Sequence, residues 1–224
     1  MTVAAVITAA GQGTRLGSTL PKGLVAVAGR PLVAHALDRI GPLVSTTVVT
    51  GVAERIPEFV HVVGGRADVV AGGATRQASV WAGLRALVDR GIGPDDIVMI
   101  HDSARAFMPT SVMRATLAAV EAGADAAVPV IPVVDTLVTA PGEGDAYGQG
   151  VDRDSVRAVQ TPQVFRMATL AHAHEASQGE AATDDAALVR SLGYQVVATD
   201  GHPWGFKVTH AGDLALAAFI AEQS

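Results

Sequence analysis

The sequence predicts an α/β protein with a Rossmann-like, open and mostly parallel sheet. Short apolar segments alternate with longer segments of helical periodicity, the order expected when crossover helices join parallel strands. Apolar residues make up 49% of the chain and aromatic residues only 4%, which suits strands buried between helices. The length of 224 residues fits a single domain, 1–224, with a substantial core.

The first half of the chain carries most of this alternation. Residues 3–8 form a short apolar run that ends at a glycine-rich stretch, as a buried strand does. Pro31 suits the first turn of a helix. The expected elements are strands at 3–8, 46–50, 96–100 and 126–131, and helices at 31–40, 75–89 and 110–122. On the helix at 75–89 the residues expected to face the core are Val80, Leu84, Leu87 and Val88.

The pattern changes between residues 132 and 162. Two β-prone segments, 133–139 and 155–161, flank a cluster of turn residues at 141–145. A hairpin that projects from the core cannot bury both of its faces alone, so we expect 133–161 to be a protruding β-arm that contacts a second subunit. A surface loop is the alternative. Beyond it, helices are expected near 167–177, 184–191 and 211–221, and a strand near 195–198.

Charge and composition exclude several classes of function. With 16 Lys and Arg against 22 Asp and Glu, the net charge of −6 argues against nucleic acid as the main partner. The absence of cysteine excludes disulfides, thiolate catalysis and cysteine-ligated zinc, and fits a cytoplasmic protein. No apolar run reaches the roughly 18 residues that a membrane span needs. A phosphorylated small molecule stays open as the ligand, because a few local cations can act within an acidic protein.

A glycine-rich stretch follows the first predicted strand. Residues 9–17 read AAGQGTRLG, and Lys22 lies shortly beyond them. Gly11 and Gly13 allow backbone N–H groups to approach a ligand. Arg15 and Lys22 add two cations suited to phosphate oxygens. The spacing matches neither the dinucleotide-binding GxGxxG pattern nor a Walker loop. A plain tight turn is the alternative for the glycines, but the two cations favour phosphate binding.

Six further short segments follow in order along the chain. They are GGATRQASV at 72–80, HDSAR at 101–105, PVVDT at 132–136, TPQVF at 161–165, TDDA at 183–186 and FKVT at 206–209. Together with residues 9–22, they resemble the motifs of the 2-C-methyl-D-erythritol 4-phosphate cytidylyltransferases, a family with the nucleotidyltransferase fold. The resemblance covers nearly the whole chain.

The resemblance implies a reaction. The phosphate of methylerythritol phosphate attacks the α-phosphorus of CTP, pyrophosphate leaves, and the product is the CDP-alcohol of the non-mevalonate isoprenoid pathway. No covalent enzyme intermediate is needed, which agrees with the lack of cysteine and of an evident Ser-His-Asp set. The resemblance also implies Mg²⁺ as cofactor and a homodimer that forms through the β-arm.

The motif matches also imply residue roles. Arg15 and Lys22 are expected to be catalytic, because cations at the α-phosphate stabilise the charge that develops there in the transition state. Asp102 is expected near the ribose or the Mg²⁺ ion, as a tentative metal ligand. The expected substrate-binding residues are Ala9, Ala10, Gly11, Gly73, Ala74, Ser79, Asp102, Arg105, Thr136, Arg153, Thr161 and Lys207.

Within this set, the resemblance separates three groups. The glycine-rich loop contacts the nucleotide through its backbone, and the segment 73–79 reads the cytosine. Lys207 binds phosphate near the attacking group, while Arg105 lies near the acceptor or braces its own loop. Thr136 and Arg153, on the arm, reach the active site of the partner subunit.

One position departs from the family's pattern. The family usually has a lysine two residues after the threonine of PxxDT, and this chain has Val138. The related ribitol-5-phosphate cytidylyltransferases can lack that lysine, so ribitol 5-phosphate is the alternative acceptor. The segments AAG at 9–11 and TDDA at 183–186 favour methylerythritol phosphate. A non-catalytic nucleotide-binding paralogue is the alternative from another class, and the presence of both Arg15 and Lys22 argues against it.

A few residues are expected to have no direct role. Arg76 is expected to hold its loop in shape, and Trp81 to be a packing residue. His172 and His174 show no convincing metal-ligand spacing and are expected on the surface.

Overall fold

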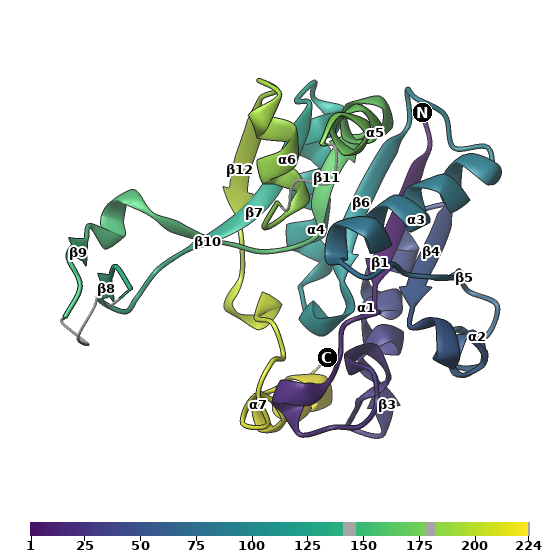
Figure 1. The fold of residues 1–224 in the computed structure, drawn as a ribbon, viewed down its shortest axis with the longest axis horizontal. Coiled ribbons are helices and arrows are strands. Elements are labelled where there is room, and N and C mark those ends of the chain that lie inside the picture. The colour runs from purple at the N-terminus through teal and green to yellow at the C-terminus, as the bar shows by residue number, and fades with distance from the viewer. Residues whose placement is uncertain (141–146, 178–181, 224) are drawn as a thin grey trace.

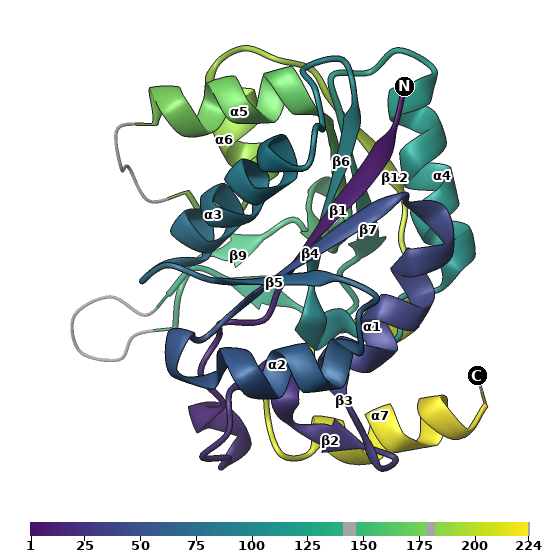
Figure 2. The ribbon, with the colours of Figure 1, turned by 90° about the vertical axis from the view of Figure 1, so that its right-hand side faces the viewer.

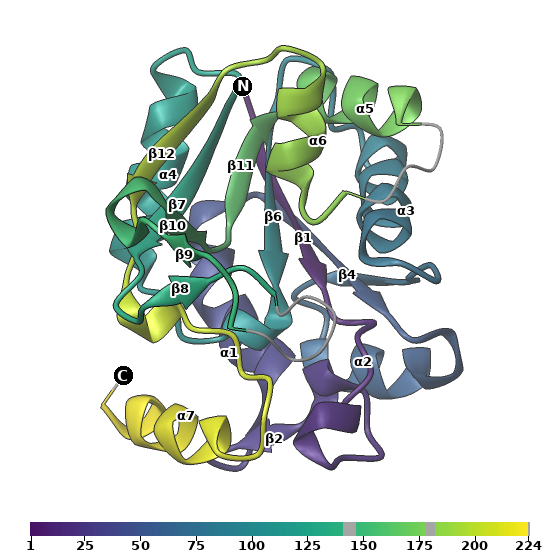
Figure 3. The same ribbon diagram turned by 60° about the vertical axis from the view of Figure 1, so that its left-hand side comes forward.

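A computed structural model describes residues 1–140, 147–177 and 182–223 of the chain (Figure 1). Its centre is a mixed sheet with eight strands in the described residues. The strand order is β10 (Arg157–Val159), β7 (Ala126–Pro132), β11 (Gln163–Arg166), β6 (Ile97–Asp102), β1 (Val3–Thr8), β4 (Thr46–Gly51) and β5 (Asp68–Ala71), and β12 (Val196–Asp200) also pairs with β7. Figure 3 shows β11 between β6 and β7.

Helices cover both faces of the sheet (Figure 2). One apolar core lies beneath α1 (Leu32–Ile40), α2 (Ile56–Val63) and α4 (Thr110–Glu121), and includes Val33, Phe59 and Met113. The other lies beneath α3 (Arg76–Asp89), α5 (Met167–Ala176) and α6 (Asp185–Ser191), and includes Leu84 and Leu170. A third cluster joins α7 (Asp213–Glu222) to the small hairpin of β2 (Ala26–Val27) and β3 (Arg30–Pro31). In the described residues no helix is long and apolar enough to cross a membrane.

The parallel strands bring the functional segments to one edge of the sheet. β1 pairs in parallel with β4 and β6, so that Thr8 lies opposite both Thr50 and Asp102. β5 continues the parallel order beyond β4. Because the carboxyl ends of parallel strands meet at one edge, the segments that follow β1, β4, β5 and β6 converge there.

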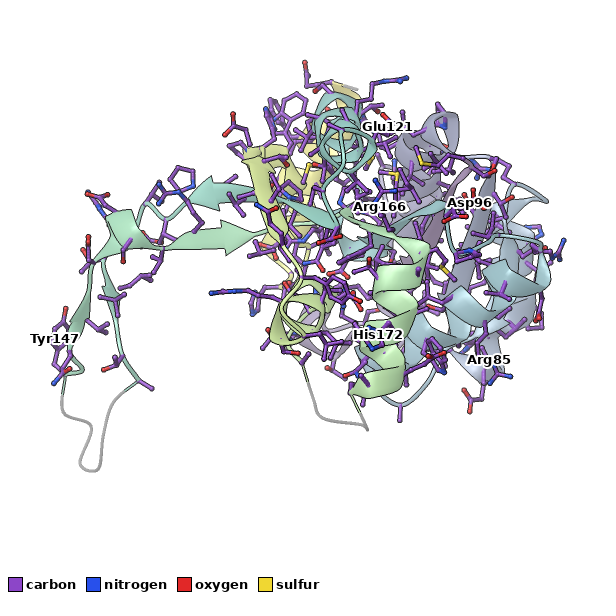
Figure 4. The ribbon with its side chains drawn as sticks, turned by 90° about the horizontal axis from the view of Figure 1, so that it is seen from above. Arg85, Asp96, Glu121, Tyr147, Arg166 and His172 are labelled. Atoms are coloured by element: carbon purple, nitrogen blue, oxygen red, sulfur yellow. The ribbon has the colours of Figure 1, made fainter. Side chains whose placement is uncertain are left out.

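The arm leaves the body where β7 ends. Its outer part is the pair β8 (Leu137–Val138) and β9 (Gly150–Val151), and β10 returns along β7 (Figure 1). Val134 and Tyr147 are 81% and 83% exposed, and Figure 4 shows Tyr147 on the arm, far from the body. The predicted turn at 141–145 lies outside the described residues. The last two residues of the expected range, Gln160 and Thr161, are buried in the body.

The predicted α/β class, the parallel strands and the protruding arm are confirmed, with some local corrections. β11 runs antiparallel between β6 and β7 and was not predicted, nor were α2, β5 and the β2–β3 hairpin. Val88 is 54% exposed and not in the core. At 100° per residue it lies about 80° around α3 from Val80, outside the narrow buried stripe. The expectation for His174 was also wrong, since this side chain is buried.

Gly83 sets how closely α3 lies on the sheet. A Cβ atom there would meet the side chain of Val6, with Val6 Cγ2 at 2.9 Å and Thr50 Cγ2 at 3.2 Å. We expect Gly83→Ala to lower the free energy of unfolding by about 1–2 kcal/mol, because overpacking outweighs the better helix propensity of alanine. Urea unfolding measures the difference.

Gly212→Ala is the matched control for this substitution. Gly212 has φ −62° and ψ −27°, and apart from its chain neighbours no atom lies within 4 Å of the added Cβ. Alanine there should leave stability unchanged or raise it by about 0.5 kcal/mol. A Gly83→Ala protein as stable as the Gly212→Ala protein would contradict the close contact of α3 with the sheet.

Candidate active site

A cavity of about 650 Å³ opens at the carboxyl edge of the parallel strands. Its walls come from the segments after β1, β4, β5 and β6, and from the chain before α7. The lining residues are Thr8, Ala10, Gly11, Gln12, Thr14, Arg15, Lys22, Val52, Ala53, Glu54, Gly72, Gly73, Ala74, Thr75, Arg76, Ser79, Asp102, Ser103, Ala104 and Lys207.

The glycine-rich loop forms one wall, and backbone hydrogen bonds fix its shape. Ala9 extends β1 by donating its N–H to the Thr50 carbonyl oxygen at 2.8 Å, which explains why Ala9 is buried behind the wall. The Gly11 carbonyl accepts the N–H of Lys22 at 2.9 Å, so the loop closes on itself. Gly13 has no room for a side chain, because a Cβ atom would meet the Leu20 carbonyl oxygen. The loop therefore brings the lysine to the same wall as Gly11.

Four cations line the cavity. They are Arg15, Lys22, Arg76 and Lys207, and Lys22 and Lys207 are the only lysines in the chain. Burial lowers the pKa of Lys22, and the positive charges of Lys207 and Arg15 lower it further. In the part of the chain that the structure describes, Arg15 and Lys22 have no carboxylate partner. A bound polyanion would relieve the repulsion between these neighbouring positive charges.

The segment after β5 forms the opposite wall. The Gly72 N–H donates to the Gly51 carbonyl at 2.8 Å, and a Cβ atom on Gly72 would lie 2.8 Å from both Ala10 Cβ and Ser79 Oγ. The Ser79 hydroxyl accepts the Gly73 N–H at 3.1 Å and donates to the Thr75 carbonyl at 2.9 Å. Ser79 therefore shapes the backbone that faces the ligand, and one acceptor position of its hydroxyl is left over.

Asp102 ends β6 at the floor of the cavity and is held by three donors. Its Oδ1 accepts from Thr8 Oγ1 and from Arg76 Nε, both at 3.2 Å. Its Oδ2 pairs with Lys207 Nζ at 2.7 Å. Burial alone would raise the pKa of Asp102, but Arg76 and Lys207 hold it well below its usual range. The carboxylate therefore stays charged over the whole physiological pH range.

Behind this floor lies a second carboxylate, Asp185, which belongs to the TDDA segment at 183–186 but was not expected to have a role of its own. Asp185 Oδ2 pairs with Arg76 Nη1 at 2.6 Å, and Asp185 Oδ1 lies 3.0 Å from His174 Nε2. The sequence did hold a signal for this cluster. Leu170, Ala173 and His174 share one face of α5, and a polar residue on a buried face needs a partner. Arg76, expected only to shape its loop, connects this cluster to the cavity.

Five of the predicted site residues do not line this cavity: Ala9, Arg105, Thr136, Arg153 and Thr161. Arg105 donates to the carbonyl oxygens of Gly205 at 2.8 Å and Val159 at 3.1 Å, so it braces two loops against each other. Thr161 Oγ1 accepts the backbone N–H of Asp102 at 3.1 Å and supports the cavity floor from below. Thr136 and Arg153 are exposed on the arm.

Comparisons with known proteins agree with this architecture. Residues 3–223 match the family model of 2-C-methyl-D-erythritol 4-phosphate cytidylyltransferase. The chain is 42% identical to the enzyme so named from Saccharopolyspora erythraea, over 98% of this chain and 99% of that protein. It is 46% identical to the one from Deinococcus radiodurans, over 96% of this chain and 87% of that protein.

A solved structure extends the agreement to three dimensions. The crystal structure of 2-C-methyl-D-erythritol 4-phosphate cytidylyltransferase from Thermus thermophilus superposes with a TM-score of 0.81 at 38% identity, covering 99% of this chain and 100% of that one. Fold, motif order and sequence identity therefore agree along the whole length. The chain belongs to the 2-C-methyl-D-erythritol 4-phosphate cytidylyltransferase family.

Proposed function

We propose that the cavity at the carboxyl edge is where this chain transfers the cytidylyl group of CTP to 2-C-methyl-D-erythritol 4-phosphate. The observation that supports this site is the meeting of Arg15, Lys22 and Lys207 beside the glycine-rich loop. These cations complement a triphosphate, and the backbone of the loop can approach it closely. The acceptor is methylerythritol phosphate, as in the family, in spite of Val138.

The reaction needs charge stabilisation more than proton transfer. An oxygen of the acceptor phosphate attacks the α-phosphorus, the bond to the β-phosphate oxygen breaks, and its electron pair leaves with pyrophosphate. The attacking phosphate is already an anion, so no general base is required. Among the described residues, no histidine lines the cavity. Arg15 and Lys22 stabilise the negative charge that builds on the α-phosphate oxygens, and Lys207 binds the acceptor phosphate.

The opposite wall recognises the base. Backbone groups of Gly73 and Ala74, held in place by Ser79, present fixed donors and acceptors to the cytosine edge. A site built this way discriminates strongly, because a wrong base leaves buried polar groups without partners.

The residues at the cavity fit a Mg²⁺ ion that arrives with the nucleotide. The described residues contain no cluster of three or more metal-binding side chains, and Mg²⁺ commonly takes only one or two carboxylates plus phosphate oxygens and water. Asp102 and Glu54 are the carboxylates in the lining. Asp102 accepts from three donors, which leaves one of its roughly four acceptor positions for the ion. The ion would offset negative charge on the triphosphate.

The β-arm holds a second subunit and completes that subunit's active site. A two-stranded hairpin is at best marginally stable alone, and the arm exposes Val134 and Tyr147, so contact with a second subunit would stabilise it. Arg153 Nη1 donates to the Val134 carbonyl at 2.9 Å, so its guanidinium is fixed to the arm rather than to the body. In the homodimer, Thr136 and Arg153 therefore lie at the partner's acceptor site. The whole chain acts as one domain, with an arm that ends before Gln160, which is buried in the body.

The first prediction concerns the cation on the glycine-rich loop. Arg15→Ala should lower kcat for pyrophosphate release from CTP and methylerythritol phosphate by roughly a hundredfold to a thousandfold, because the transition state loses one of its cations. Arg85→Ala is the control, since it removes an exposed cation of α3 that lies outside the cavity lining (Figure 4). Equal activity of the two variants would contradict the catalytic role of Arg15. If the unmodified protein released no pyrophosphate with this acceptor, the function itself would be wrong.

The second prediction concerns the metal. Chelation by EDTA should abolish turnover, and added Mg²⁺ should restore it, because the triphosphate needs a counter-ion for in-line attack. The thermal unfolding midpoint of the nucleotide-free protein should not change with EDTA, since the described residues form no metal cluster of their own. A lower midpoint in EDTA would point to a structural ion instead.

The third prediction tests the arm with mixed dimers. Arg153→Ala should leave the dimer intact and raise KM for methylerythritol phosphate, and Lys22→Met should inactivate the subunit's own pocket. When the two variants are mixed in equal amounts, about a quarter of the sites combine an intact pocket with an intact partner arm. Activity should therefore rise toward that fraction, measured after exchange of subunits. No gain on mixing would mean that Arg153 does not serve the partner subunit's pocket.

A further inference from the structure

A buried ion-pair network lies between α3, α5 and α6, behind the wall of the cavity. We propose that Asp185, supported by His174, is a positioning residue that fixes Arg76 and, through it, the orientation of Asp102 and Lys207. This inference rests on the proposed function of the cavity, because it assigns the network a role in placing groups that bind the nucleotide and acceptor.

Arg76 has its position set by two carboxylates. Its Nη1 pairs with Asp185 at 2.6 Å and its Nε with Asp102 at 3.2 Å. Its third nitrogen, Nη2, is buried and has no hydrogen-bond partner among the described residues. Burial alone would lower the pKa of Arg76, but Asp185 and Asp102 raise it above its usual value. Without Asp185, Asp102 would be the one remaining ionic anchor in the described network.

Loss of Asp185 changes the charge balance at the cavity floor. Arg76 and Lys207 carry two positive charges, and Asp102 and Asp185 carry two negative charges. With Asp185 neutralised, both cations compete for Asp102. The planar fork of an arginine can take both oxygens of a carboxylate, which a lysine cannot do. Arg76 then draws Asp102 Oδ2 away from Lys207, and the lysine loses its fixed place in the cavity.

Asp185 itself is held tightly, which a positioning residue requires. It is 1% exposed. His174 contacts its other oxygen, and the ring of Trp81 stacks on His174 at a centroid distance of 5.7 Å and an angle of 11°. Gln163 anchors the start of α6 through bonds to Asp184 Oδ2 and the Ala186 N–H, at 2.8 and 3.1 Å. These contacts fix the orientation of the Asp185 carboxylate, with Oδ2 toward Arg76.

The adjacent residue supplies a matched control. Asp184 caps α6 by accepting the Ala187 N–H at 2.8 Å, and it makes no ion pair with Arg76. Asparagine caps a helix about as well as aspartate. Its NH2 group would replace the oxygen that accepts from Gln163 Nε2, so Asp184→Asn loses one hydrogen bond at the start of α6 but no contact with Arg76, and activity should change little. Asp184→Asn and Asp185→Asn remove the same charge, one residue apart, with nearly the same shape, and only Asp185→Asn takes a partner from Arg76.

The environment of the Lys207 side chain can be followed by NMR in the absence of substrate. Because Lys22 and Lys207 are the only lysines of the chain, reductive methylation with ¹³C-formaldehyde gives two lysine signals in NMR spectra beside that of the N-terminus, and the positive charges are kept. Asp185→Asn should shift the Lys207 signal, and Asp184→Asn should leave it in place. The Lys207→Arg protein assigns the signals.

The kinetic test compares the same variants, after far-UV circular dichroism and thermal unfolding show that each is folded at the assay temperature. Asp185→Asn should lower kcat/KM for methylerythritol phosphate roughly ten- to a hundredfold, because Lys207 loses the place from which it binds the acceptor phosphate; loss of a residue that orients a metal ligand has an effect of similar size. Asp184→Asn should stay within about twofold, because Asn keeps the cap. Because Asp185 acts through Arg76, Asp185→Asn should lower kcat/KM only slightly further in a protein that already has Arg76→Lys.

Each outcome bears on the inference separately from the proposed function. An active unmodified protein with equal activities and unshifted Lys207 signals in both Asn variants would overturn the role of Asp185. If the losses of kcat/KM from Asp185→Asn and Arg76→Lys were additive in the double variant, Asp185 would act independently of Arg76. That result would also overturn the inference. If Asp185→Asn does not fold, Arg76→Lys decides: full activity overturns the inference, and a tenfold loss with a shifted Lys207 signal supports it. An inactive unmodified protein would instead refute the proposed function.

Discussion

The pairing of Asp102 with Arg76 and Lys207 connects three parts of the molecule that are far apart in the sequence. Asp102 ends a central strand, Arg76 opens α3, and Lys207 lies in the segment before α7. Taking a carboxylate out of water is costly unless cations and hydrogen bonds compensate for the loss. The buried Asp102 carboxylate is therefore stable only when the segments that carry Arg76 and Lys207 are in place. The assembly of these three segments also forms the cavity.

Close backbone contacts impose a second constraint on the same edge of the sheet. Gly72 lies against Ala10 and Ser79, and Gly13 against the Leu20 carbonyl, so neither position has room for a side chain. The two walls therefore approach each other as backbone surfaces, which present fixed N–H and carbonyl groups. Such a surface can read a base and a triphosphate with little loss of side-chain entropy on binding.

The sequence predicted the parallel strands and the loop between them because those features are local. An apolar run followed by glycines, as at residues 3–13, indicates a strand and its turn without knowledge of the rest of the chain. β11 was missed because its four residues are too few to show a period, and its place between β6 and β7 depends on tertiary pairing. Asp185 and His174 were missed as functional residues for a related reason. The position of His174 on an apolar helix face indicates a buried polar group, but it does not identify the partner, which lies on another helix.

The distribution of charge explains how an acidic protein can select a small polyanion. The net charge is −6, so long-range forces repel polyanions such as nucleic acids from most of the surface. Both lysines of the chain and Arg15 nevertheless face one cavity of about 650 Å³. Inside a concave site the local cations are screened less by salt than exposed charges are. A ligand small enough to enter therefore meets a positive site, and a longer polyanion stays outside with the acidic surface. Size and charge together favour a nucleoside triphosphate over a nucleic acid.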